Sequence, residues 1–132
     1  MSRTISFIAA AVLASAVLGA TALAAGEPLR LIGRTDVPGF EGDFDHFAAD
    51  VKGNRLFLAG EEKGTLEVFD LKSGKHVKTV DGLEEPHAIV YMPEKNRLIV
   101  SNSGDGMTKV LDATTLKVID TIKLPSGDTK KL

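Results

Sequence analysis

The sequence contains neither cysteine nor tryptophan, and its 132 residues include a single tyrosine. Without cysteine the chain has no disulfides, thiolate nucleophiles or Cys-based zinc sites, so apolar burial must stabilise it. The scarcity of aromatic residues argues against an aromatic platform for binding sugars. Charge of one sign is also lacking, since 16 basic and 18 acidic residues are interspersed without a basic patch. Nucleic acid is therefore not an expected partner.

The N-terminus has the three parts of a secretion signal. Arg3 supplies a basic start, an uncharged apolar run follows from residue 5 to 18, and Ala22-Leu23-Ala24 has the small-x-small pattern of a cleavage site. The apolar run is shorter than the roughly 20 residues of a membrane span. An uncleaved anchor is the alternative interpretation. We expect a helical signal peptide at 1–25, a periplasmic or secreted protein, and no stable membrane insertion after cleavage.

A repeat with a period of 42 residues organises the mature part, residues 26–132. Residues 54–80 and 96–122 share eight identities at this offset, among them Asn54-Arg55-Leu56 with Asn96-Arg97-Leu98. Chance would give about two. The substitutions between the copies are mostly conservative, as in Phe57 and Ile99. Such a period is typical of repeat architectures in which each unit packs on its neighbours.

Each repeat contains four short aliphatic or β-branched runs separated by turn residues, which predicts antiparallel strands. The expected strands are 46–51, 55–59, 65–70, 76–80, 87–92, 97–101, 108–112 and 118–123. Four strands per unit at this period is the pattern of a β-propeller blade. The fold class predicted is thus all-β, a partial propeller with blade one at about 44–82 and blade two at about 86–124. A ninth, N-terminal outer strand is expected over 29–37.

The second repeat resembles the YVTN-repeat (YncE-like) family of exported propellers. The residues that carry the resemblance are Leu98-Ile99-Val100-Ser101-Asn102, a Gly-x-x-x-Val-x-Asp strand at 106–112, and a Lys-x-Ile-x-Thr-Ile segment ending before Pro125. The first repeat departs from the pattern, with Leu-Phe-Leu-Ala-Gly in place of the Asn-ending strand. The resemblance implies a seven-bladed ring of about 300 residues or more, of which this chain would hold under a third. Members include binding proteins, lyases and redox-enzyme subunits, so it does not define one function.

Two blades leave two apolar sheet faces without neighbours, since repeat units bury their faces against one another. The chain could be a truncated product, a fragment, or a unit that completes a ring with other copies. Self-association through the exposed blade faces is therefore an expected partner interaction, beside an unidentified small ligand or protein.

His46 and His87 are the sharpest candidates for a site, because an offset of 41 places both near the start of the innermost strand. That position faces the central channel of a propeller, where ligands usually bind. Histidines repeated around a channel could bind a divalent metal. The alternative, which we favour, is that each caps a strand by hydrogen bonding to a loop. His76, on an outer strand, is expected to face solvent.

An acidic loop, Glu41, Asp43 and Asp45, precedes His46. It could hold a cation or supply a general base near the channel, and Asp45 joins the two histidines as a candidate ligand-binding residue. The spacing matches no EF-hand loop. A solvated inter-blade loop is the favoured interpretation.

Asp70 and Asp112 end the third strand of each repeat. Paired carboxylates can serve acid–base catalysis, but a residue that recurs in every blade is better explained as a cap on the following turn. Asn54 and Asn96, each followed by an arginine on an exposed strand edge, are interpreted as turn residues. No phosphate-binding loop, nucleophile elbow or haem-attachment motif is present.

Two classes of function fit these observations. The first is a non-catalytic module that binds a small ligand or protein, with no cofactor beyond a divalent metal and no catalysis by this chain alone. The second is a fragment of a periplasmic enzyme, either a metal-dependent lyase or lactonase or a cofactor-carrying redox subunit. The lyase alternative predicts that histidine recurs at one position of every blade.

Overall fold

The computed structural model describes residues 29–123, and the predicted signal peptide lies outside them. The described chain forms eight strands and one short 3-10 helix. The strands are β1 (Phe44–Asp50), β2 (Arg55–Gly60), β3 (Thr65–Asp70), β4 (His76–Val80), β5 (Pro86–Met92), β6 (Arg97–Asn102), β7 (Met107–Asp112) and β8 (Val118–Lys123), with the 3-10 helix at Pro93–Lys95. No helix in this stretch has the length and apolar character needed to cross a membrane.

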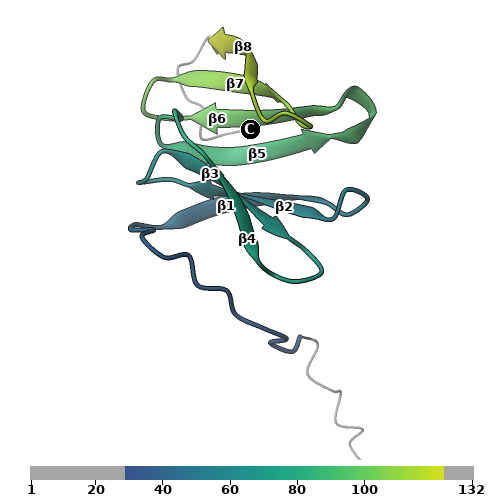
Figure 1. Ribbon diagram of the computed structural model, residues 1–132. Coiled ribbons are helices and arrows are strands. Elements are labelled where there is room, and N and C mark those ends of the chain that lie inside the picture. The colour runs from purple at the N-terminus through teal and green to yellow at the C-terminus, as the bar shows by residue number, and fades with distance from the viewer. Residues whose placement is uncertain (1–28, 124–132) are drawn as a thin grey trace, which may run out of the picture. The chain divides into compact units, whose positions relative to one another are not determined.

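The strands form two four-stranded antiparallel sheets, each a simple meander. The first sheet has the order β1-β2-β3-β4 and the second β5-β6-β7-β8. The two sheets stack face on face, as Figure 1 shows. All eight strands predicted from the repeat are therefore confirmed, within two residues at either end. Residues 29–123 thus form an all-β partial propeller of two blades.

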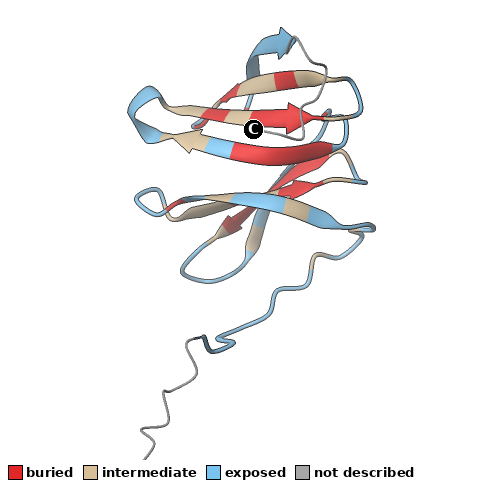
Figure 2. Cartoon of the chain, turned by 180° about the vertical axis from the view of Figure 1, so that it is seen from behind, coloured by how far each residue is buried: buried red, intermediate tan, exposed pale blue. Residues whose placement is uncertain are grey.

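The hydrophobic core lies between the sheets. One face of the first sheet, with Phe57, Ala59, Leu66 and Val68, packs on the opposite face of the second sheet. The other members of this core are Leu83, Ile89, Leu98, Val100, Leu111, Ala113 and Leu116. Figure 2 shows the buried stretches on the strands that face each other, whereas β8 is exposed along its whole length. Each fully buried Leu or Phe contributes about 1.5–3 kcal/mol.

The predicted ninth strand at 29–37 is wrong. No strand precedes Phe44 in the described residues, and Leu31 and Ile32 are exposed. An extended segment becomes a strand only where another strand pairs with it, and both described sheets are complete at four. The end of this segment instead lies on the first sheet, where the Thr35 hydroxyl donates a hydrogen bond to the Gly74 carbonyl.

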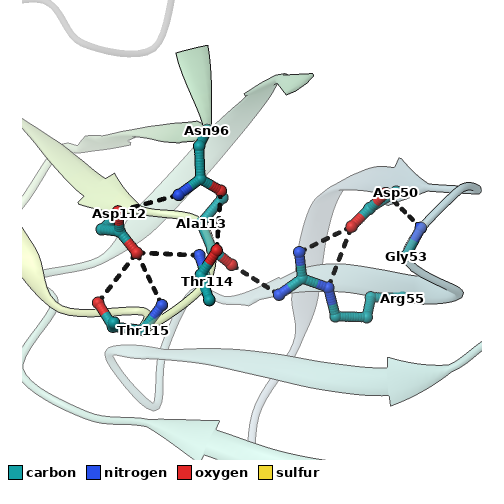
Figure 3. Close-up of polar contacts among 8 residues, drawn as sticks. All are labelled: Asp50, Gly53, Arg55, Asn96, Asp112, Ala113, Thr114 and Thr115. Carbon is teal, nitrogen blue, oxygen red and sulfur yellow. Dashed lines mark hydrogen bonds and ion pairs between the residues drawn. The ribbon is translucent and has the colours of Figure 1, made fainter. Parts of the chain in front are cut away.

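The turns after the third strands have the carboxylate caps expected from the repeat. Asp112 accepts hydrogen bonds from the backbone N–H groups of Thr114 at 3.0 Å and Thr115 at 2.8 Å (Figure 3). Asp70 accepts one from the Ser73 N–H at 2.7 Å. These backbone N–H groups lower the pKa of both carboxyl groups. The structural interpretation of this aspartate pair is confirmed.

The asparagines are also turn residues, as predicted. Asn54 and Asn96 adopt left-handed backbone conformations, with φ of 59° and 52°, which asparagine tolerates better than most residues. Each side-chain amide donates to the aspartate at the end of the third strand, Asn54 to Asp70 and Asn96 to Asp112. In the first sheet this links the turn before β2 to the turn after β3, and in the second sheet it links the turn before β6 to the turn after β7.

His76 does not face solvent as predicted. Only 24% of its side chain is exposed, and its Nε2 lies 2.6 Å from Oε2 of the buried Glu67. The Thr65 and Thr79 hydroxyls donate to the same carboxylate, at 2.8 and 2.5 Å. The sequence of β3 does not reveal this cluster. The strand is buried on both faces from Thr65 to Phe69, so a polar residue in it cannot be assigned to a solvent face by alternation.

Candidate functional site

A β-bulge interrupts the first strand of each sheet, and the two bulges fix how the repeats align. The pairing shifts between Phe44 and Phe47 in β1, and between Pro86 and Ile89 in β5. Both boundaries are thus offset by the same 42 residues as the rest of the repeat. A bulge bends the strand and re-aims side chains, and bulges are frequent beside functional sites.

The predicted equivalence of His46 and His87 is wrong. At the offset of 42, the residue equivalent to His87 is Asp45, and the residue equivalent to His46 is Ala88. The apparent match at an offset of 41 slips by one residue, and a slip of one residue in a strand moves a side chain to the other face. His46 accordingly lies at the surface, with 64% of its side chain exposed.

His87 nevertheless contacts its repeat equivalent. Its side chain is only 8% exposed, and its Nδ1 lies 2.5 Å from Asp45 Oδ2. The other oxygen of Asp45, Oδ1, lies 2.6 Å from His46 Nδ1. All three candidate residues named from the sequence therefore meet at the junction of the two sheets, with Asp45 between the histidines.

Two further oxygens surround the other nitrogen of His87. Nε2 lies 2.9 Å from Ser103 Oγ and 3.4 Å from Glu61 Oε1. Glu61 and Ser103 follow β2 and β6 directly and are themselves 42 residues apart. The same two positions of the repeat, one at the bulge and one after the second strand, thus supply His87 itself and the three side chains that contact its imidazole.

The hydrogen-bond directions define what Nε2 can face. An ionised carboxylate only accepts, so the contact with Asp45 assigns a proton to Nδ1. The Ser103 hydroxyl donates to Glu85 Oε2 at 2.8 Å, which directs its hydrogen away from His87. Nε2 therefore faces oxygen lone pairs of Ser103 and Glu61. A positive charge at this point, either a proton on Nε2 or a bound cation, satisfies all of these groups.

The charge balance around His87 favours a cation. Burial opposes ionisation of Asp45, but the hydrogen bond from His87 and the neighbouring imidazoles outweigh it and lower the pKa of Asp45. Asp45 and Glu61 then lie beside one buried imidazole, at its two nitrogens. The Glu61 carboxylate therefore leaves Nε2 of His87 facing negative charge, which a cation balances.

The ligand atoms of Asp45, Glu61 and His87 all lie within 4.8 Å of one another, close enough to hold a metal ion. One ion cannot use both nitrogens of His87. The geometry fits coordination by Nε2 and Glu61, with Asp45 behind Nδ1 in the role of the carboxylate that orients a ligating histidine. Such a donor set suits zinc and similar divalent ions. Zinc takes about four ligands, so positions remain for water or a bound ligand.

The rest of the acidic loop does not join this cluster. Glu41 and Asp43 are exposed, and Asp43 contributes only its backbone carbonyl, which accepts the Glu61 N–H at 3.1 Å. Sequence reasoning therefore selected Asp45 correctly as a neighbour of the histidines but missed Glu61 and Ser103. Glu61 and Ser103 could have been found because they lie at the same position of the repeat, 42 residues apart. Comparing the repeats for identical residues misses them, because one is glutamate and the other serine.

The comparisons with known proteins place this architecture among β-propellers. No protein-family profile matches the chain, and no curated protein sequence matches it. Similar solved structures include apo AztD from Citrobacter koseri, with a TM-score of 0.57 and 22% identity over 69% of this chain and 25% of that chain. The β-propeller domain of Myceliophteria thermophila Cps50 (Swd1) has a TM-score of 0.54 and 14% identity over 64% and 26%.

Kuenenia stuttgartiensis hydrazine synthase is a third similar structure, with a TM-score of 0.54 and 20% identity over 60% of this chain and 23% of that one. The chain spans about a quarter of the length of the structures it matches. At these identities the likeness shows the fold alone. The chain is a β-propeller module.

Proposed function

We propose that this β-propeller module binds a divalent cation at His87, and through the cation's open positions a small ligand. The observation that carries the proposal is the buried imidazole, whose Nδ1 is held by Asp45 and whose Nε2 faces Glu61 and Ser103. A histidine held in this way is oriented to offer Nε2 to a metal.

The arrangement favours binding over the lyase alternative. A lyase of the predicted kind needs histidine at one position of successive blades, whereas this repeat places aspartate and histidine at the bulge position. The N-terminal signal pattern and the resemblance to YVTN repeats support the further proposal that the module belongs to that exported family and works in the periplasm or outside the cell.

Calorimetric titration of the purified protein with zinc and with manganese tests the proposal. We expect zinc to bind with a stoichiometry of one, and His87→Ala and Glu61→Gln each to weaken binding at least tenfold. Glu61→Gln keeps the shape of a partly exposed side chain, so it separates loss of a ligand from loss of the fold.

His46→Ala is the matched control, because it removes an imidazole bound to the same Asp45 but outside the proposed pair of ligands. It should change the zinc affinity by less than threefold. Binding that is unaffected by Glu61→Gln and His87→Ala, or that is lost only with His46, would overturn the proposal.

A further inference from the structure

Each sheet leaves one apolar face that the described residues do not cover with another sheet. On the first sheet the apolar residues of this free face are Phe47, Leu56, Leu58, Phe69 and Leu71, and the strand pairing places Glu67 beside them on the same face. Phe47 is 66% and Leu71 is 40% exposed. Leu56, Leu58, Phe69 and Leu71 line a cavity of about 360 Å³, and Thr35 and Val37 of the segment before β1 form part of its wall.

On the second sheet the free face consists of Val90, Ile99, Ser101, Thr108 and Val110. Val90, Ile99 and Val110 form one row across β5, β6 and β7, as the strand pairing shows. Val90 is 43% exposed, and Ile122 on β8, which pairs with Thr108, is 44% exposed.

The repeat shows what each free face is built to contact. The residues of the second sheet that are equivalent to the free face of the first are Ile89, Leu98, Val100, Leu111 and Ala113, and every one of them is buried in the core. The equivalents of the free face of the second sheet are Ala48, Phe57, Ala59, Leu66 and Val68, which form the other half of that core. Each free face thus repeats one half of the interface between the two sheets.

The sizes of the side chains on the two free faces also compensate one another. Relative to the internal interface, the free face of the first sheet is larger, with Phe69 in place of Leu111 and Leu71 in place of Ala113. The free face of the second sheet is smaller at its two largest positions, with Ile99 in place of Phe57 and Thr108 in place of Leu66. At these four positions the larger side chains on one face match smaller ones on the other, as close packing favours, while Val90 is larger than its equivalent Ala48.

We propose that the free face of the second sheet of one copy docks on the free face of the first sheet of a second copy. The contact is head to tail, so it uses two different surfaces and can continue from copy to copy. Because propellers close with about four to eight blades, two-blade units close with about two to four copies. The occupant of the cavity on the first sheet is then the row formed by Val90, Ile99 and Val110 of the next copy.

Two variants that each remove one face test the proposal by mixing. Phe47→Glu places a charge on the free face of the first sheet, and Val90→Lys places one on the free face of the second. Both positions are exposed in the single chain, so neither change affects its core. Light scattering coupled to size exclusion should show two to four copies for the unchanged protein and monomers for each variant alone.

An equimolar mixture of the two variants should form a 1:1 dimer and nothing larger, because only one intact face of each kind remains. Val51→Glu is the matched control, since Val51 is an 80% exposed apolar residue in the turn after β1 and lies on neither face. It should assemble like the unchanged protein. A monomeric unchanged protein, assembly of either variant alone, a mixture that stays monomeric, or loss of assembly in the control would each overturn the proposal.

Discussion

Arg55 and Arg97 occupy the same position of the repeat but make different contacts. Arg55 donates through Nη2 and Nε to Asp50 Oδ2, at 2.7 and 3.1 Å, and through Nη1 to the Ala113 carbonyl of the other sheet at 2.6 Å (Figure 3). Arg97 has one long ion pair, 3.5 Å, with Asp112, and donates through Nη1 to the neighbouring Asn96 carbonyl at 3.0 Å. The prediction that both lie on exposed strand edges therefore misses the role of Arg55, which ties the two sheets together.

Replacing Arg55 by methionine should lower the free energy of unfolding by about 2 kcal/mol, because it leaves the buried Asp50 carboxylate without its cation. Arg97→Met is the control that the repeat itself supplies, and it should cost about 0.5 kcal/mol or less, as is usual for a surface ion pair. Urea unfolding followed by circular dichroism measures both values. Equal losses for the two variants would contradict the role assigned to Arg55.

At the scale of elements, the hairpin turns depend on aspartates whose ionised form the fold stabilises. Burial opposes ionisation of Asp50, but the hydrogen bonds from Arg55 and from the Gly53 N–H outweigh it and lower its pKa. Backbone N–H groups lower the pKa of Asp70 and Asp112 at the turns after β3 and β7. In each case the charged carboxylate is part of the folded turn.

An aspartate whose pKa is lower in the folded chain than in the unfolded chain stabilises the fold at pH values above its unfolded pKa. This contribution is lost as the pH falls through the folded pKa. We therefore expect stability to fall steeply below about pH 4, the ordinary range of aspartate. The double variant Asp70→Asn/Asp112→Asn should show a shallower loss between pH 5 and pH 2.

Thermal unfolding at a series of pH values checks the expected difference. Asp36→Asn is the control, since Asp36 is exposed and lies before the first strand. It should follow the unchanged protein over the whole range. An acid dependence that is the same in the double variant and in the unchanged protein would rule out the turn aspartates as its source.

The elements themselves could be predicted because strand and turn signals agree in both repeats. Asn54 and Asn96 mark one turn, and Asp70 and Asp112 mark another, so two copies of each signal confirm the same register. The prediction of a ninth strand at 29–37 failed because it used only the apolar pattern of that segment. A strand also needs a neighbouring strand to pair with, and the pattern of one segment does not show whether such a neighbour exists. The equivalence of His46 with His87 failed because matching of identical residues ignores the bulge, which sets the offset.

At the scale of the whole molecule, the two sheets share one core, and their free faces repeat its two halves. The core of the internal interface is apolar, and its repeat equivalents remain largely apolar on the two free faces. The same junction between sheets carries the polar cluster around His87, built from two positions of the repeat. Packing and the candidate site therefore depend on the same stacking of one blade on the next.

The protonation and coordination of His87 can be observed directly by long-range ¹H–¹⁵N NMR, since the chain has three histidines and their signals can be assigned by single substitutions. On addition of zinc we predict that Nε2 of His87 takes the chemical shift of a metal-bound nitrogen, that Nδ1 keeps its proton, and that His46 and His76 change little. A shift at Nδ1, or a response confined to His46 or His76, would contradict the account.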